Sequence, residues 1–462
     1  MSLQLYNSLE GKKQEFIPLE EGKVGMYVCG VTVYDYCHVG HARVMIVFDV
    51  MYRWLKQSGY DVNYIRNFTD VDDKIIARAA ERNIDIQVLT NEMIAEFHKD
   101  MDALGCLRPS LEPRATTHMP AMITMIESLI KHGNAYVSDS GDVLYAVRSF
   151  EGYGKLSGKN IDDLESGSRV DVDESKRDTL DFVLWKKAKA GEPSWDSPWG
   201  EGRPGWHIEC SAMSCEHLGH TFDIHGGGMD LKFPHHENEI AQACASNDGQ
   251  FARYWLHNGF VNINAEKMSK SLGNFFSIRE VLKKYHPEVL RMFILGTHYR
   301  SPLDFSDSAL DVAKAGLDRL YETKRRLKKI GINELIPAFI TNDVFEKAMN
   351  DDFNTPEALA KVFSLNKEIN KRMDAGLDVF DDDLLIKFST MLGLLAIVKV
   401  DADGWFQGVD SDLVSAIENL IVERAVAKKS RDFARADAIR DALAVQGIVL
   451  EDSATGTTWK RG

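Results

Sequence analysis

The sequence lacks any run of 18 apolar residues, any C-x-x-C pair, any internal repeat and any low-complexity segment. Without such a run we expect no membrane span, and the first residues, "MSLQLYNSLEGKK", lack the apolar segment of a signal peptide. The cysteines are too few and too scattered for a disulfide framework, at positions 29, 37, 106, 210, 215 and 244. We therefore expect a cytoplasmic protein.

Positive charge is also scarce. The 55 Lys and Arg residues face 70 Asp and Glu residues, which gives a formal net charge of −15. Such a chain does not attract nucleic acid over its whole surface, so any nucleic-acid site must be a local basic patch. The hydrophobic content of 44% and the charged content of 27% are ordinary for a globular protein. A length of 462 residues suffices for two to four domains.

The N-terminal part has a strand–helix–strand order. Residues 22–35, "GKVGMYVCGVTVYD", are typical of a buried strand that runs into a loop. Residues 41–60 have the pattern of a helix that ends at Gly59, and residues 61–83 that of a strand, a loop and a helix. This order favours a parallel α/β sheet.

The rest of the chain changes character twice. Residues 111–195 mix short strands with turns and a polar stretch, which indicates an insertion. The α/β pattern resumes at "GWHIECSAMS" and "FDIHGGGMDLKFPHHENEIAQAC". From about residue 306 the pattern is helical up to Gly447, and "GIVLED" and "GTTWKR" then predict a small hairpin.

The first candidate site is "YDYCHVGHAR", with His38, Gly40 and His41 in a loop between a strand and a helix. In open α/β sheets ligands bind at the carboxyl ends of strands, where a helix N-terminus attracts phosphate. Two imidazoles can donate to phosphate oxygens, and Gly40 lets a ring lie against the backbone. The alternative is a polar loop with an incidental histidine pair.

The second is "KMSKSLGN", which begins at Lys267 and includes Lys270. Two lysines and two serines within five residues, followed by Gly273, suit a mobile loop over a polyanion. Taken alone, such loops are usually solvated surface.

The third is a set of metal-ligand types: Cys29, Cys37, Cys210, Cys215, His235, His236 and Glu239. Cys29 and Cys210 each follow an apolar stretch, and we expect both at strand ends that converge on one crevice. With Glu239 and one histidine they would give an S₂NO set that suits Zn²⁺. Spacing does not choose between His235 and His236, since both face Glu239 on a helix. The alternative is that the cysteines are buried core residues.

The loop H-x-G-H followed at long range by K-M-S-K-S resembles the double signature of class I aminoacyl-tRNA synthetases, with Val39 in place of the usual isoleucine. Over essentially its full length the chain resembles bacterial-type cysteinyl-tRNA synthetases. The segments that carry this resemblance are "CGVTVYDYCHVGHAR", "NFTDVDDKII", "PGWHIECSAMS", "FDIHGGGMDLKFPHHENEIAQ", "EKMSKSLGNF", "DDFNTP" and "GIVLED…GTTW".

The resemblance implies one Zn²⁺ per chain, held by Cys29, Cys210, His235 and Glu239, which binds the sulfur of the substrate cysteine. Serine differs only by oxygen for sulfur, and ordinary pockets separate such near-isosteres poorly. A thiol gives its proton up to a metal readily, whereas an alcohol does not. The resemblance also implies two reactions: cysteine and ATP form cysteinyl-adenylate and pyrophosphate, and cysteine then moves to the terminal adenosine of tRNA-Cys.

Further roles follow from the same resemblance. Gly30, Thr69 and Trp206 are expected to line the cysteine pocket. In "HGGGMD", Gly228 is expected to approach adenosine closely and Asp230 to accept from the ribose hydroxyls. The residues expected around the triphosphate, together with Mg²⁺, are His38, Gly40, His41, Lys267 and Lys270, of which the histidines and lysines are the expected catalytic groups.

The expected architecture is a Rossmann-type parallel-sheet catalytic domain with an insertion, then a helical bundle and a small mixed α/β C-terminal domain. The expected bounds are 1–110 with 196–245 for the catalytic domain, 111–195 for the insertion, 246–305 for a connecting domain that bears K-M-S-K-S, 306–400 for a helical tRNA-binding domain and 401–462 for an anticodon-binding domain. We expect a monomer with ATP, L-cysteine and tRNA-Cys as its partners and no membrane contact.

The candidate basic patch lies in "RAVAKKSRDFARADAIR". One continuous helix would align Arg424, Lys428, Arg431 and Arg435 on one face, whereas Asp432 as an N-cap would start a second helix there. Either arrangement suits phosphate binding, and the alternative is a solvated charged face. Trp459 is predicted either to stack on a base or to anchor the hairpin.

Three rival functions share features of this sequence. A ligase that joins cysteine to an amino sugar would use the same core and zinc, but it would lack the C-terminal segments. An inactive paralogue would not need intact HVGH and KMSKS motifs. A zinc hydrolase would need a general base beside an open metal position.

Overall fold

A computed structural model describes residues 2–161, 176–247, 249–263, 266–267, 275–334, 344–379, 382–407, 411–453 and 456–461. It divides into two compact units. The N-terminal unit comprises Met1–Ala313, Ala338–Val362 and Leu394–Ala396, and the C-terminal unit comprises Lys314–Pro337, Phe363–Gly393 and Ile397–Gly462. Among the described helices, none combines the length and the apolar character that crossing a membrane would require.

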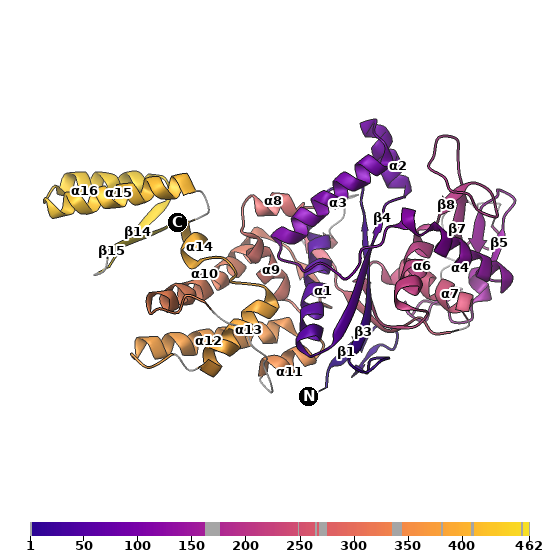
Figure 1. The fold of residues 1–462 in the computed structure, drawn as a ribbon, viewed down its shortest axis with the longest axis horizontal. Coiled ribbons are helices and arrows are strands. Elements are labelled where there is room, and N and C mark those ends of the chain that lie inside the picture. Colours follow the sequence, from indigo (N-terminus) through magenta and orange to yellow (C-terminus); the bar gives the residue numbers. More distant parts are fainter. Residues whose placement is uncertain are drawn as a thin grey trace. The chain divides into compact units, whose positions relative to one another are not determined.

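A parallel four-stranded sheet forms the centre of the N-terminal unit (Figure 1). Its order is β10-β9-β3-β4, with β3 at Lys23–Thr32, β4 at Asp61–Thr69, β9 at Phe222–Gly228 and β10 at Ala252–Asn258. Every residue of β9 is buried, as is typical of a parallel strand covered on both faces. Helix α1 (Val39–Gln57) covers one face and α6 (Trp206–Leu218) the other. The expected parallel α/β fold is confirmed.

The strand order places a ligand crevice in this sheet. The chain steps from β3 through α1 to β4 in one direction and from β9 through α7 (Glu237–Asn247) to β10 in the other. The order therefore reverses between β3 and β9, and ligands bind at such a switch point, at the carboxyl ends of the strands. Strand β10 joins this sheet beyond residue 245, the boundary expected from the sequence.

A bulge shapes the carboxyl end of β3. Val28 pairs with Arg66 and Val31 with Phe68, so that Cys29 and Gly30 together face the single residue Asn67. The N–H of Gly30 donates to Asn67 Oδ1 at 2.8 Å. A Cβ on Gly30 would lie 1.6 Å from the Asn67 carbonyl oxygen, so only glycine fits. Such bulges redirect side chains next to functional sites, and here the side chain is that of Cys29.

Smaller elements surround this core. Strands β5 (Ala135–Val137), β6 (Val143–Tyr145) and β7 (Phe182–Lys187) lie within the expected insertion 111–195, and they form a four-stranded antiparallel sheet with β8 (Gly202–Pro204), which lies beyond it. The other strands are β1 (Gln4–Asn7), β2 (Lys12–Glu15), β11 (Val261–Ile263), β12 (Glu266–Lys267) and β13 (Leu303–Asp304). The other helices that lie wholly in this unit are α2 (Asp73–Arg82), α3 (Ile86–Ala103), η1 (Ala115–Thr117), α4 (Met119–Lys131), η2 (Val147–Ser149), η3 (Lys232–His236), α8 (Ile278–Leu282), α9 (Pro287–Leu295) and α11 (Val344–Asn350).

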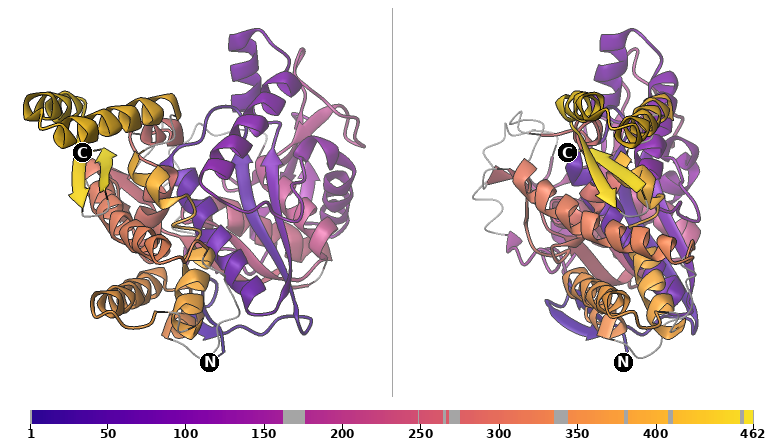
Figure 2. Two further views of the ribbon diagram at one scale, coloured as in Figure 1. Left: turned by 60° about the vertical axis from the view of Figure 1, so that its left-hand side comes forward. Right: turned by 90° about the vertical axis from the view of Figure 1, so that its left-hand side faces the viewer.

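The C-terminal unit is mainly helical, as expected. Helices α10 (Asp307–Lys329), α12 (Thr355–Asp374) and α13 (Asp382–Leu395) contribute most of their length to it. They are followed by α14 (Ala402–Gln407), α15 (Ser411–Lys429), α16 (Phe433–Val445), β14 (Ile448–Ser453) and β15 (Gly456–Arg461). The last four form a small module (Figure 2), and its antiparallel hairpin confirms the one expected at the C-terminus.

Candidate active site and metal centre

A cavity of about 380 Å³ lies at the switch point. The expected site residues that line it are Cys29, Gly30, His38, Gly40, His41, Trp206, Gly228 and Asp230. They come from the ends of β3 and β9, the start of α1, the start of α6 and the turn after β9. The fold therefore brings together residues that are far apart in the sequence.

The two signature histidines cap α1. His38 is the N-cap residue. Its side-chain Nδ1 accepts from the backbone N–H of Gly40 at 3.1 Å, and the backbone N–H of His38 donates to Nδ1 of His41 at 3.2 Å. Because both Nδ1 atoms accept, each neutral ring carries its hydrogen on Nε2. The rings stack with centroids 3.8 Å apart. Two Nε2–H donors and the positive end of a helix dipole thus lie together at the start of α1, an arrangement that favours an anion.

A buried cluster of metal-ligand types lies beside this cavity. Its members are Cys29, Cys210, His235 and Glu239. Cys29 Sγ lies 3.7 Å from Cys210 Sγ, 3.5 Å from His235 Nε2 and 3.4 Å from Glu239 Oε1. His235 Nε2 lies 3.0 Å from Glu239 Oε1. Tetrahedral Zn²⁺ with S, N and O ligands requires separations of about 3.3–3.8 Å, so three of these four fit and the last is slightly short.

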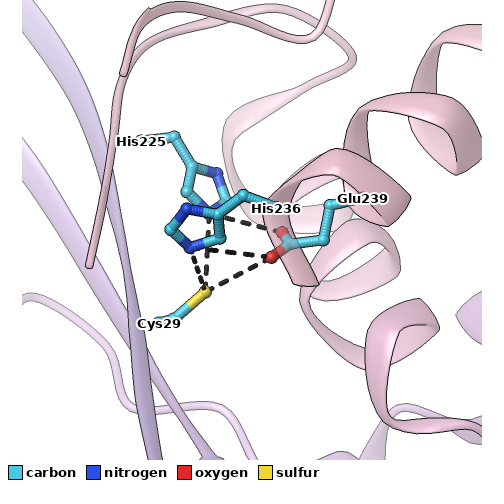
Figure 3. Close-up of side chains that lie close together, drawn as sticks. All are labelled: Cys29, His225, His236 and Glu239. Carbon is cyan, nitrogen blue, oxygen red and sulfur yellow. Dashed lines mark hydrogen bonds and ion pairs between the residues drawn. The ribbon is translucent and has the colours of Figure 1, made fainter. Parts of the chain in front are cut away.

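A second set shares two members with the first: Cys29, His225, His236 and Glu239 (Figure 3). Cys29 Sγ lies 3.5 Å from His225 Nε2 and 3.3 Å from His236 Nε2. His225 Nε2 lies 3.3 Å from Glu239 Oε2, and His236 Nε2 lies 3.9 Å from Glu239 Oε1. Because the two sets share Cys29 and Glu239, one ion can use only one of them. The choice between His235 and His236 is thus a choice between two complete ligand sets.

The protonation states of the cluster suit a cation. Burial, followed by the hydrogen bond with Cys210, raises the pKa of Cys29 well above its usual value, and burial likewise raises that of Glu239. Burial acts to raise the pKa of Cys210, but the hydrogen bond from the Cys29 thiol, together with the hydrogen bond and the charge of His235, outweighs it and lowers the pKa to about 7. A divalent cation would displace the protons on Cys29 and Glu239 and balance the buried anions.

Cys210 lies on a different kind of element from the one expected. It lies in the second turn of α6, not at the end of a strand, so that expectation was wrong. Residues Ile208 to Ser214 are all buried, and the helix therefore lacks the polar stripe that identifies a helix in a sequence. His235 is the penultimate residue of η3, and Glu239 lies in the first turn of α7, where an acidic side chain interacts favourably with the helix dipole.

Groups around the first set hold its ligands in place. His207 Nδ1 lies 2.9 Å from Nδ1 of His235, and the Cys210 thiol lies 3.6 Å from Asn67 Oδ1. The ring of Trp206 stacks on that of His235 with centroids 4.2 Å apart. Trp206 is 41% exposed and also lines the cavity. His235 thus connects the buried cluster to the open cavity.

Thr69 stays only a predicted member of the cysteine pocket. It is buried and is not among the described residues that line the cavity. Its hydroxyl donates to Glu209 at 2.7 Å, and burial raises the pKa of that carboxyl well above its usual value. Thr69 and Glu209 form a neutral hydrogen-bonded pair behind the site.

Sequence reasoning missed several of these residues. Lys74 lines the cavity, and Asn67 contacts both Gly30 and Cys210. Asn67 is a polar residue inside an otherwise buried strand, which was a usable signal. His207 and Glu209 lie at the start of α6, and the fully buried segment from Ile208 to Ser214 gives that helix no periodic pattern to mark them.

The K-M-S-K-S motif is only partly described. The backbone of Lys267 ends β12, which pairs with β11, and β11 begins at the cavity-lining residue Val261. Lys270 lies outside the described residues. The roles expected of both lysines stay predictions.

The C-terminal basic residues lie at a junction of two helices, not on one continuous helix. Asp432 is the N-cap of α16 and accepts from the N–H of Arg435 at 3.0 Å. Arg424 is 6% exposed and binds Asp452 with two bonds of 2.9 and 3.0 Å. Lys428 also binds Asp452, at 2.8 Å. These contacts hold α15 against the hairpin.

Three further residues belong to this region. Arg435 pairs with Glu423 at 2.7 Å, whereas Arg431 is exposed at the junction with a left-handed φ of 64°. Trp459 is 1% exposed, and its Nε1 donates to Glu418 at 2.7 Å. Trp459 therefore anchors the hairpin and is not available to stack on a base.

Comparisons with known proteins agree with this geometry. Residues 15–315 match the family described as tRNA synthetases class I (C) catalytic domain, residues 344–398 the DALR domain, and residues 410–459 the cysteinyl-tRNA ligase anticodon binding domain. The cysteine–tRNA ligase of Thioalkalivibrio sulfidiphilus is 58% identical over 100% of both chains. That of Chromobacterium violaceum is 55% identical over 99% of this chain and 100% of its own.

The chain belongs to the cysteine–tRNA ligase family. Solved structures of other class I synthetases share its fold. A Mycobacterium tuberculosis methionyl-tRNA synthetase in complex with methionyl-adenylate superimposes with a TM-score of 0.59 at 15% identity, and it covers 81% of this chain and 88% of its own. A leucyl-tRNA synthetase from Agrobacterium radiobacter superimposes with a TM-score of 0.56 at 11% identity. The superposition covers 82% of this chain and 84% of that synthetase. These two likenesses concern the fold alone.

Proposed function

We propose that this ligase forms cysteinyl-adenylate from L-cysteine and ATP and then transfers cysteine to the terminal adenosine of tRNA-Cys. The observation that carries the proposal is the position of Cys29, which lines the same cavity as His38 and His41 and also belongs to the metal-ligand cluster. A ligand in that cavity can touch a phosphate-binding helix end and a sulfur-binding metal centre at once. Cysteinyl-adenylate carries both a phosphate and a sulfur.

The phosphate end of the site consists of α1 and its capping histidines. During adenylate formation the substrate carboxylate attacks the α-phosphate, and negative charge builds up on the phosphate oxygens. The Nε2–H groups of His38 and His41 are proposed to donate to these oxygens as this charge develops. Lys74 adds a cation to the same cavity. Lys267 and Lys270 are proposed to approach the phosphates from the K-M-S-K-S segment, with Mg²⁺ bound to ATP.

The sulfur end is proposed to hold one Zn²⁺ on Cys29, Cys210, His235 and Glu239. This set is favoured over the one with His225 and His236 because it includes a second thiolate and because Trp206 connects His235 to the cavity. When bound, the ion would act as a Lewis acid with a preference for a thiolate over an alcohol. His207 orients the imidazole of His235. The stacked indole of Trp206 covers the substrate side of the cluster.

The nucleoside is proposed to lie against the turn after β9. Gly228 and Asp230 both line the cavity there. The glycine lets a base or ribose approach the backbone closely, and the Asp230 carboxylate can accept from ribose hydroxyls. Gly30 in the bulge is proposed to do the same for the amino-acid backbone.

Binding of tRNA is proposed to involve the helical region 306–400 and the module at 401–462. The match of residues 410–459 to an anticodon binding domain supports this assignment. The exposed basic residues at the junction of α15 and α16, including Arg431, are the proposed phosphate contacts. The cytoplasmic location and the monomeric state stay predictions.

The decisive assay is cysteine-dependent exchange of pyrophosphate into ATP, followed by charging of total tRNA. We expect exchange with cysteine, no exchange with serine and charging of a single acceptor class. Equal exchange with serine would contradict the role of the metal cluster. Exchange without charging, together with coupling of cysteine to an amino sugar, would favour the rival ligase.

A further inference from the structure

A second group of metal-ligand types lies outside the catalytic cavity. His118 precedes α4, His217 lies in the last turn of α6, and their Nε2 atoms are 2.9 Å apart. The ring planes are inclined at 72°, with centroids 5.1 Å apart. A carboxylate oxygen of Glu216 lies within 4.8 Å of both nitrogens. Both histidines are half-buried and Glu216 is exposed, so the group is open to solvent on one side.

The hydrogen bonds around His118 fix its tautomer. Nδ1 of His118 lies 2.7 Å from the carbonyl oxygen of Arg114. A carbonyl can only accept, so Nδ1 carries the hydrogen and Nε2 presents its lone pair toward His217. Backbone carbonyls orient metal-binding histidines in this way in known sites.

The separation of the two nitrogens matches a shared cation. Two imidazole nitrogens at about 2.0–2.1 Å from one metal lie about 2.9 Å apart when the metal holds them at a right angle, as tetragonal Ni²⁺ or Cu²⁺ does, whereas tetrahedral Zn²⁺ holds them farther apart. The carboxylate of Glu216 can take a third position, and solvent the remaining ones. We propose that His118, His217 and Glu216 bind a divalent transition-metal ion in a second site of the chain. Imidazole ligands select Zn²⁺, Ni²⁺, Co²⁺ or Cu²⁺ over Mg²⁺ and Ca²⁺.

This site is independent of the catalytic cluster. His217 lies about two turns, or roughly 10 Å, after Cys210 along α6. The two groups share no residue, and none of the three ligands lines the catalytic cavity. An ion here would tie the start of α4 to the end of α6, the helix that also carries Cys210 and Trp206. It would therefore stabilise the fold around the active site without taking part in the reaction.

The test uses the full chain with the catalytic cluster loaded with Zn²⁺ and excess metal removed. Ni²⁺ is then titrated calorimetrically, and zinc and nickel contents are measured after gel filtration. We expect one nickel ion per chain in addition to the zinc, and a rise in thermal midpoint with nickel. His118→Gln and His217→Gln should each weaken nickel binding about tenfold or more, because each removes a direct ligand. Glu216→Gln should weaken it less.

The matched control is His220→Gln, which changes an exposed histidine three residues after His217 that is not part of the group. It should bind nickel as the wild type does. All variants should keep their zinc and their pyrophosphate exchange, which shows that they are folded and separates this proposal from the proposed function. Absence of a second ion in the wild type, or equal nickel binding by the His118 and His217 variants, would overturn the site. Equal loss in His220→Gln would show adventitious binding and overturn it as well.

Discussion

The Sγ atoms of Cys29 and Cys210 lie 3.7 Å apart, although 181 positions separate the two residues in the chain. The bulge at the end of β3 turns Cys29 toward α6, and the second turn of α6 supplies Cys210. The separation is far longer than a disulfide bond of about 2.05 Å, but it equals the edge of a tetrahedron around zinc with Zn–S bonds of about 2.3 Å. The fold therefore holds the two thiols at a distance that suits a shared metal.

Replacing Cys210 should remove the metal. In Cys210→Ser we expect the zinc content to fall from about one ion per chain to near zero, because an alcohol does not deprotonate to replace the thiolate. Elemental analysis after dialysis against a weak chelator measures this. Cys215→Ser changes a cysteine of the same helix that belongs to neither ligand set, and it should keep its zinc. Full zinc retention in Cys210→Ser, with loss in His236→Gln, would assign the metal to the other set.

Much of the site was predictable because it depends on chemical type and local spacing. His38 and His41 lie at the start of the helix that the sequence predicted, and His235 and Glu239 meet at the predicted i, i+4 spacing. Long-range partners were harder to predict. Cys210 was placed on a strand, because it lies in the fully buried segment Ile208–Ser214 of α6, which carries no polar stripe. The second histidine set was missed because His225 comes from a neighbouring strand, and sequence spacing does not show that it lies near.

Charge patterns were the least reliable guide. A run of basic residues does not show which acidic groups the fold brings to it. Arg424 and Lys428 turned out to bind Asp452, and Arg435 to bind Glu423. Burial of Trp459 depends likewise on the packing of the hairpin against α15 and α16, which the sequence left open.

Asp49→Asn should destabilise the N-terminal unit strongly. Arg291 is fully buried, and its guanidinium donates to Asp49, which is 2% exposed. Burial alone would raise the pKa of Asp49, but Arg291 and Arg53 outweigh it and lower the pKa, so the carboxyl is charged. Its removal leaves a buried cation without its partner, at a cost of about 3–5 kcal/mol. Urea unfolding of both proteins measures this loss of unfolding free energy, provided that the dependence of that free energy on urea concentration is the same in both.

The matched control for Asp49→Asn is Glu81→Gln. Glu81 pairs with Arg78 at 2.8 Å, but it is 68% exposed, and such pairs contribute about 0–1 kcal/mol. If both variants lost the same small amount of stability, the pair of Arg291 and Asp49 would not be the structural tie between α1 and α9 that its burial indicates.

Lys270→Ala should slow adenylate formation and spare cysteine binding. An ammonium group beside the phosphates matters most as negative charge develops, so its loss should lower kcat for pyrophosphate exchange about 10²-fold with little change in KM for cysteine. Lys283→Ala changes an exposed lysine further along the chain and should behave as the wild type. A variant with normal kcat but a raised KM for cysteine would contradict the expected phosphate role.

Deleting residues 408–462 should separate activation of cysteine from recognition of tRNA. The residues Ile417, Ile421, Ile439, Leu443, Ile448 and Trp459 form a hydrophobic core that lies wholly within the deleted segment. The deletion starts after Gln407 because Trp405 stacks on Tyr321 with centroids 4.2 Å apart and belongs to the preceding helices. Pyrophosphate exchange should be unchanged, since every described residue of the cavity lies before residue 262.

The same deletion should raise KM for tRNA by about an order of magnitude or more, because phosphate contacts supply much of nucleic-acid affinity. The double variant Lys429→Glu with Arg431→Glu should reproduce part of this defect and reduce the salt dependence of tRNA binding, since both side chains are exposed at the helix junction. Arg424→Glu is the contrasting change: it breaks the pair between the buried Arg424 and Asp452 and should lower the stability of the module instead. Normal charging of tRNA by the truncated chain would show that the basic junction is solvated surface, whereas loss of pyrophosphate exchange in a folded truncated chain would show that the catalytic site depends on the C-terminal module.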